Sequence, residues 1–159
     1  MNAQVDDNLK AQCALVAATC GWYNLRRADR GITQLYASHL ASSGLQPTQF
    51  SLLTVCEVAG DVPITALANT LVMDRTTLAR NLKPLERQGL VQVAVGDDQG
   101  DRRVRIVRLT EKGREALRQA LPLWEEAQAQ VVGALGEERL RHALQEVAAL
   151  EAVALRREP

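Results

Sequence analysis

One stretch of the chain, residues 65–110, contains a sequence pattern that few folds can satisfy. The spacing of its apolar residues predicts a short helix over 65–71 and a second helix over 75–88, separated by the turn Val72-Met73. Asp74 immediately precedes the second helix and belongs to a residue type that caps helix starts. In that helix the apolar residues step by four and three and are expected to face inward: Leu78, Leu82 and Leu85.

A predicted hairpin follows the helix pair. Val91, Val93 and Val95 alternate with less apolar residues, which is the spacing of a half-buried strand. A loop beginning at Gly96 leads to a return strand over 103–109. The order helix, turn, helix, hairpin predicts a mainly α fold with a small β wing, that is, a winged helix-turn-helix.

Helices with apolar stripes are predicted on both sides of this domain. A long helix covers most of residues 1–44, with a shift of its stripe near Gly21, and a helix starting at Pro47 opens the domain. Residues 61–64 have little helical pattern and are expected to be a linker. Helices after Thr110 are predicted to break at Gly133 and Gly136. We therefore divide the chain into a winged domain, 45–113, and two helical segments, 1–44 and 114–159, whose uncovered stripes predict a homodimer.

Charge is concentrated in the same stretch. The whole chain has 19 basic and 19 acidic residues, so its net charge is zero. Residues 75–114 hold ten Lys/Arg and five Asp/Glu, a net charge of +5, and the remainder carries −5. A local positive charge inside a neutral chain favours an anionic partner at the winged domain.

The polar outer face of helix 75–88 suits contacts with DNA. Arginine can donate two hydrogen bonds to guanine, asparagine can pair with adenine, and threonine can meet phosphate or a thymine methyl group. A solvated helix face would look similar, but the arginine-rich hairpin that follows favours double-stranded DNA as the partner. The candidate DNA-binding residues are Thr76, Thr77, Arg80, Asn81 and Arg87 on the helix and Arg102 and Arg105 on the hairpin.

The sequence resembles the MarR family of bacterial transcription regulators over nearly its whole length. The motifs that carry the resemblance are Leu45-Gln-Pro-Thr-Gln-Phe, Met73-Asp-Arg-Thr-Thr-Leu, Leu85-Glu-Arg-Gln-Gly-Leu, Asp101-Arg-Arg and Leu109-Thr-Glu-Lys-Gly. The resemblance implies a homodimer in which the terminal helices interlock. It also implies that Arg103 enters the minor groove, that Asp101 braces the wing, and that the major groove is read by Thr76, Thr77 and Arg80.

The regulatory signal is left open between two hypotheses. Cys13 and Cys20 share one helical stripe, so they are either packed in the dimer core or sensors of oxidants or soft metals. Cys56 is expected to lie in the core of the winged domain. Alternatively the signal is a small ligand, which the family resemblance places, often as a phenol, between the dimer helices and the winged domain. Candidate lining residues are Trp22, Tyr23, Tyr36 and His39.

Other functional classes receive less support. The sequence shows no nucleophile–base–acid set, metal-ligand cluster or glycine-rich phosphate loop, so we expect neither an enzyme nor a cofactor or metal. A winged-helix module that binds an acidic protein is the remaining alternative. No apolar run approaches the length of a membrane span, and the N-terminus lacks a signal-peptide core, so we expect no membrane partner and a cytoplasmic location.

Overall fold

The computed structural model describes residues 3–95 and 104–155. The chain divides into two compact units, residues 1–38 and 39–159, which we describe separately. Over these described ranges, no helix is long and apolar enough to cross a membrane.

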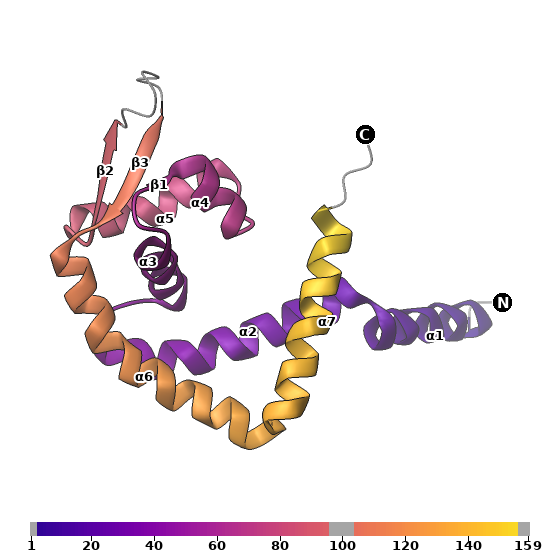
Figure 1. Cartoon of the computed structure of the whole chain (residues 1–159). Coiled ribbons are helices and arrows are strands. Elements are labelled where there is room, and N and C mark those ends of the chain that lie inside the picture. Colours follow the sequence, from indigo (N-terminus) through magenta and orange to yellow (C-terminus); the bar gives the residue numbers. More distant parts are fainter. Residues whose placement is uncertain (1–2, 96–103, 156–159) are drawn as a thin grey trace. The chain divides into compact units, whose positions relative to one another are not determined.

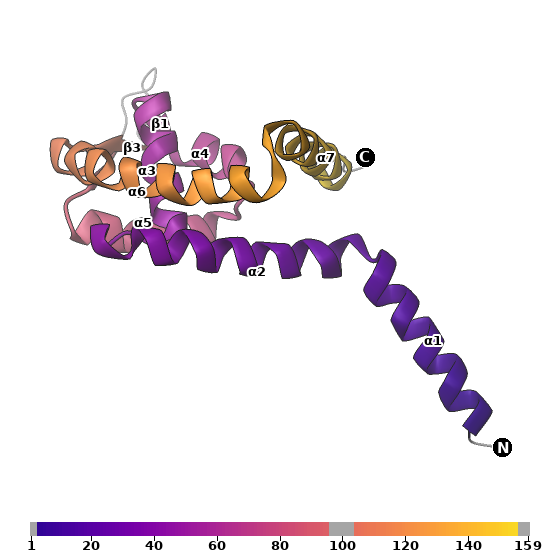
Figure 2. The same cartoon turned by 90° about the horizontal axis from the view of Figure 1, so that it is seen from below.

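The first unit contains two helices where the sequence predicted one with a bend. Helix α1 covers Ala3–Thr19 and helix α2 covers Gly21–Leu40, with a break at Cys20 (Figure 2). The Asn24 amide donates to the carbonyl oxygens of Ala17 and Cys20, at 3.1 and 3.0 Å. The Ala17 carbonyl is the acceptor that a straight helix would pair with the N–H of residue 21, so Asn24 replaces a backbone bond at the break.

The winged domain lies in the second unit and has the predicted order of elements (Figure 1). A short 3-10 helix, Ala41–Ser43, ends at Gly44, whose φ of 73° lies in the left-handed region. The elements that follow are α3 (Pro47–Ala59), β1 (Val62–Pro63), α4 (Ile64–Thr70), α5 (Arg75–Arg87), β2 (Val91–Val95) and β3 (Arg105–Leu109). The prediction of a mainly α fold with a small β wing is confirmed.

The sheet has one more strand than the sequence predicted. Its order is β1-β3-β2, and both pairings are antiparallel. Val62 pairs with Val107 and Pro63 with Ile106, so part of the predicted linker 61–64 is a strand. The wing therefore joins the helical part of the domain through β1 as well as through its own two ends.

A single core holds these elements together. The largest fully buried side chains come from α3, α4, α5 and β3 and include Leu53, Leu67, Leu78, Leu85 and Val107. Leu40 at the end of α2 is also fully buried in this cluster, and so is Ala120 of α6 (Glu111–Leu135), the helix that follows β3. The core of the winged domain thus extends beyond residues 45–113 at both ends.

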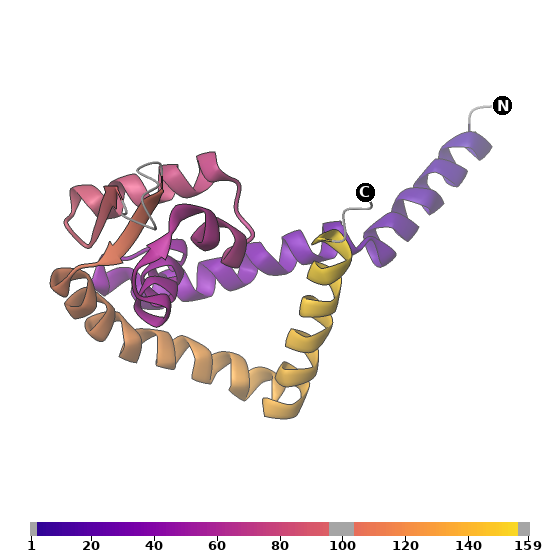
Figure 3. The ribbon, with the colours of Figure 1, turned by 45° about the horizontal axis from the view of Figure 1, so that its top comes forward.

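Two long helices complete the second unit. Helix α6 covers Glu111–Leu135 and helix α7 covers Glu137–Leu155, and they meet at a sharp corner (Figure 3). Gly136 forms the corner with a φ of 81°, as predicted. Gly133 does not break α6, because a single glycine inside a packed helix costs only about 1 kcal/mol.

Candidate DNA-binding interface

The turn between α4 and α5 is short and conformationally constrained. Val72 has a φ of 49°, an uncommon value for a β-branched residue. Two backbone hydrogen bonds fix it there, from Val72 to the Asn69 carbonyl and from Met73 to the Ala68 carbonyl, at 3.1 and 2.9 Å. The turn therefore sets the direction in which α5 leaves α4.

Asp74 caps α5, as the sequence predicted. Its carboxylate accepts hydrogen bonds from the Thr77 N–H at 2.9 Å and from the Thr77 hydroxyl at 2.7 Å. The Thr77 hydroxyl, followed by its backbone N–H, holds the pKa of Asp74 below its usual value. The cap fixes the first turn of the helix that carries most of the candidate contacts.

Helix α5 separates its apolar and polar faces in the way the spacing predicted. Leu78, Leu82 and Leu85 are buried in the core. Of the candidate DNA-binding residues, Thr76, Arg80 and Arg87 are exposed, and Thr77 and Asn81 are half-buried. The Thr77 proton is already used in the cap, so its hydroxyl oxygen is left as an acceptor.

The described part of the wing carries one of the candidate arginines. Strands β2 and β3 pair from Val91↔Leu109 to Val95↔Arg105, and Arg105 is exposed at the start of β3. The candidates Asp101, Arg102 and Arg103 lie outside the described residues.

The basic residues of the segment fall into two groups. Three of them are held by neighbours: Arg108 pairs with Asp61, Arg114 lies 3.0 Å from Glu57, and the Lys112 ammonium donates to the Gln88 carbonyl at 2.8 Å. Within the described part of the chain, the others form neither an ion pair nor a side-chain hydrogen bond: Arg75, Arg80, Lys83, Arg87 and Arg105. Within the described part of residues 75–114, the basic side chains without a partner thus lie on α5 and at the start of β3.

The Asp61–Arg108 pair is a contact that the sequence did not reveal. Arg108 donates to Asp61 and lowers the pKa of that carboxyl group. The two side chains are 53% and 51% exposed, so the pair contributes little to stability. Its consequence is to tie one wing arginine to the segment before β1.

The end of α5 is fastened to the start of α6. The Thr110 hydroxyl donates to the Gly89 carbonyl at 2.7 Å and accepts from the Gly113 N–H at 3.0 Å. Gly113 is buried against Leu90, and a Cβ there would overlap the Leu90 carbonyl oxygen. Thr110 and Gly113 therefore hold the first turn of α6 against the chain between α5 and the wing.

The three cysteines have different surroundings. Cys13 is exposed on α1, Cys20 lies at the break before α2, and Cys56 is buried in the core of the winged domain. Burial raises the pKa of Cys56 to about 11, which leaves it a thiol at neutral pH. The prediction that Cys56 is a core residue is confirmed.

The four candidate ligand-pocket residues belong to different units. Trp22, Tyr23 and Tyr36 lie on α2 in the first unit, with Trp22 73% exposed and Arg27 positioned 5.8 Å from the Tyr23 ring centre. His39 belongs to the second unit and lies 3.2 Å from the Gln130 side chain and 3.6 Å from the Glu126 carboxylate.

A separate apolar hollow lies within the second unit, between α3 and α6. Phe50 and Trp124 stack there with ring centres 6.3 Å apart. The hollow is lined by Phe50, Ser51, Thr54, Val55, Leu121 and Trp124. The sequence did not single it out, because its two walls are more than 60 residues apart.

Together the capped reading helix, the wing and the unpaired arginines define a winged helix-turn-helix protein of the DNA-binding class. Residues 43–104 match the model of the MarR family. The chain is 40% identical to the M. tuberculosis transcriptional regulator MOSR, whose structure was solved in complex with DNA; the match covers 86% of this chain and 99% of that one, with a TM-score of 0.74.

Two further relatives are similar. The transcriptional repressor CouR, solved on a 23-mer DNA duplex, is 27% identical, with 86% of this chain and 95% of that chain covered and a TM-score of 0.77. The HTH-type transcriptional regulator MhqR of Bacillus subtilis is 27% identical over 116 residues, 73% of this chain and 79% of that protein. The chain belongs to the MarR family and is a DNA-binding transcription regulator. Its family and fold are those of regulators and not of enzymes.

Proposed function

We propose that the protein is a homodimeric repressor of a pseudo-palindromic operator, and that a signal releases it from DNA. The observation that carries the proposal is a group of five exposed basic side chains that form no ion pair on α5 and at the start of β3: Arg75, Arg80, Lys83, Arg87 and Arg105. Two relatives solved in complex with DNA also support a DNA-binding repressor: MOSR, 40% identical to this chain, and the repressor CouR, 27% identical.

In the proposed complex α5 occupies the major groove. Arg80 and Asn81 contact base edges, and Thr76, Thr77 and Arg87 contact phosphates or thymine methyl groups. The wing, with Asp101, Arg102, Arg103 and Arg105, grips the neighbouring minor groove and backbone.

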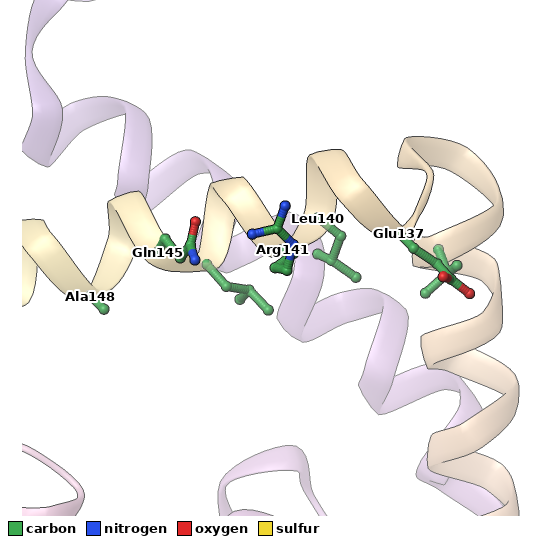
Figure 4. Close-up of a pocket in the computed structure, with 7 residues that line it drawn as sticks. Glu137, Leu140, Arg141, Gln145 and Ala148 are labelled. Carbon is green, nitrogen blue, oxygen red and sulfur yellow. The ribbon is translucent and has the colours of Figure 1, made fainter.

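The proposed dimer uses the segments 1–44 and 114–159 on either side of the reading domain. On α1, Leu9 and Val16 are more than half exposed, and on α7 Leu144 and Val153 are 59% and 68% exposed. A largely apolar hollow at the α6–α7 corner is lined by Val132, Glu137, Leu140, Arg141, Leu144, Gln145 and Ala148 (Figure 4). A second copy of the chain would cover these faces and place two reading helices about one helical turn of DNA apart, roughly 34 Å.

The test of this proposal combines mass and base discrimination. Light scattering is expected to give twice the chain mass, and gel retardation to give binding to the protein's own promoter region that weakens steeply with salt. Arg80→Ala is expected to lose about 1–3 kcal/mol of discrimination between operator and random duplexes, because Arg80 is assigned to base edges. A monomer, or equal losses on both duplexes, would contradict the proposal.

The proposed signal is a small apolar ligand. There are two candidate sites for this ligand. One is the hollow between α3 and α6, and the other is the set of residues predicted from the sequence: Trp22, Tyr23, Tyr36 and His39. The chain has two tryptophans, Trp22 and Trp124, and one belongs to each site. Fluorescence titration of Trp22→Phe and Trp124→Phe therefore tells which site a DNA-releasing ligand occupies: only the variant that keeps the tryptophan of the occupied site is expected to respond.

Thiol sensing is the second candidate signal, favoured by the exposure of Cys13 and by the position of Cys20 at the α1–α2 break. Oxidation there would alter the helix that we assign to the dimer. The test compares oxidant-induced release from DNA in the parent and in the double variant Cys13→Ser, Cys20→Ser, with Cys56→Ala as the control. Normal release by the double variant would rule out the sensor role.

A further inference from the structure

Two of the unpaired arginines share one hollow at the edge of the reading helix. The hollow is lined by residues of α4, of α5 and of the beginning of the return strand. Arg75 is the first residue of α5 and Arg105 the first residue of β3. The remaining lining residues are Ile64, Thr65, Ala79 and Val104.

The charge of this hollow is not neutralised within the described part of the chain. Arg75 and Arg105 are exposed and form no ion pair there, whereas Arg108, Arg114 and Arg118 each have an acidic partner. The acid nearest to Arg75 in sequence, Asp74, is committed to Thr77 and does not line the hollow. Two guanidinium groups around one hollow repel each other unless an anion lies between them.

The position of the hollow identifies the anion. When a reading helix occupies the major groove and a wing enters the adjacent minor groove, a single DNA strand separates the two. That strand must pass between α5 and the wing, which is where the hollow lies.

We propose that Arg75 and Arg105 jointly bind one phosphodiester group of the strand that separates the two grooves, with Ile64, Ala79 and Val104 forming an apolar floor beneath the adjacent deoxyribose. This inference rests on the proposed docking of α5 and the wing. It adds Arg75, which was not among the predicted contacts, and it gives Arg105 a partner on the reading helix. The shared phosphate fixes the distance between helix and wing on the DNA without reading any base.

The experiment is a scan of the operator with single methylphosphonate substitutions, each of which neutralises one phosphate. Parent protein, Arg75→Ala, Arg105→Ala and the control Arg118→Ala are compared by gel retardation, after circular dichroism has established that each variant is folded. Arg118 is exposed on α6 and already paired with Glu115, so its loss removes the same charge away from the hollow.

The expected result is that Arg75→Ala and Arg105→Ala each weaken binding about tenfold on operator and random duplexes alike, since each loses a charge-assisted hydrogen bond to backbone. Both variants are expected to lose part of the parent's sensitivity to methylphosphonate, and to lose it at the same single position in each half-site, because each keeps only one of the two arginines on that phosphate. Arg118→Ala is expected to keep the parent's profile.

Reduced sensitivity at two different phosphates, or an Arg75→Ala profile like that of the parent, overturns the shared site while leaving DNA binding by α5 and the wing intact. Failure of the parent to bind any duplex overturns the proposed function, and the shared site with it.

Discussion

Gly113→Ala tests whether the contact between α6 and the chain before the wing is as close as the structure shows. The added Cβ would overlap the Leu90 carbonyl oxygen and lie 2.6 Å from Leu109 Cδ1. A leucine methyl group can move aside, but the carbonyl belongs to backbone that Thr110 also holds by hydrogen bonds. To relieve this overlap, α6 must move away from the chain at Leu90, directly before β2.

The expected cost is about 3 kcal/mol, the upper end of the range for overpacking, because the obstacle is backbone. For a chain of this size that corresponds to a fall in Tm of about 6–12 °C. The assay is urea and thermal unfolding followed by circular dichroism at one fixed protein concentration, since a dimer's stability depends on concentration.

Gly133→Ala is the matched control in the same helix. A Cβ at Gly133 meets nothing within 4 Å, and alanine favours helix, so a gain of about 0.5–1 kcal/mol is expected. Equal stability of the two alanine variants would refute the argument from close approach.

Three further predictions concern single side chains. The pKa of Asp74 is lowered in the folded protein, so the contribution of this carboxylate to stability is present above the ordinary carboxyl pKa and is lost as the pH falls through the folded-state value. The variant Asp74→Asn keeps a capping side chain that does not titrate. Its free energy of unfolding in urea is therefore expected to fall less than that of the parent between pH 7 and pH 3. Iodoacetamide labelling followed by mass spectrometry is expected to leave Cys56 unmodified in the native protein and to modify it after unfolding in urea, and equal rates in the two states would show that native Cys56 is accessible. Arg108→Ala is expected to weaken DNA binding less than Arg105→Ala in a filter-binding assay, because Arg108 is already paired; the opposite order would contradict the division of the cations into paired and unpaired.

The sequence predicted the elements in which a pattern of apolar residues repeats over several helical turns. The leucines of α5 are buried as their spacing predicted. Asp74 caps the helix through a hydrogen bond from Thr77, which is only three residues further along the chain. Such features depend on local geometry, which a pattern of neighbours in sequence can express.

The features that were missed depend on contacts between distant residues or on very short segments. Strand β1 has two residues, one of them proline, and no alternation can be recognised in so short a run. The pairing of Arg108 with Asp61 joins positions 47 residues apart. At the α1–α2 break the shift of the apolar stripe near Gly21 indicated the position, but the hydrogen bonds that stabilise the break come from the Asn24 side chain, which the pattern did not single out.

The candidate site shows the same division. Composition and order were enough to find the reading helix and the wing, and the outward residues of α5 follow from where its leucines point. Which cations are free to meet DNA did not follow from sequence, because that depends on the acids and carbonyl groups that folding brings beside them.

The shortness of β1 also bears on how the wing avoids aggregation. Strand β1 forms one edge of the three-stranded sheet, and an exposed edge invites a strand of another molecule to add to it. Pro63 has no N–H to donate, so this edge can offer an added strand at most one backbone N–H donor, that of Val62. Pairing between molecules at β1 is therefore blocked by the same residue that leads the chain into α4, and β2 is left as the edge of the described sheet that remains open to association.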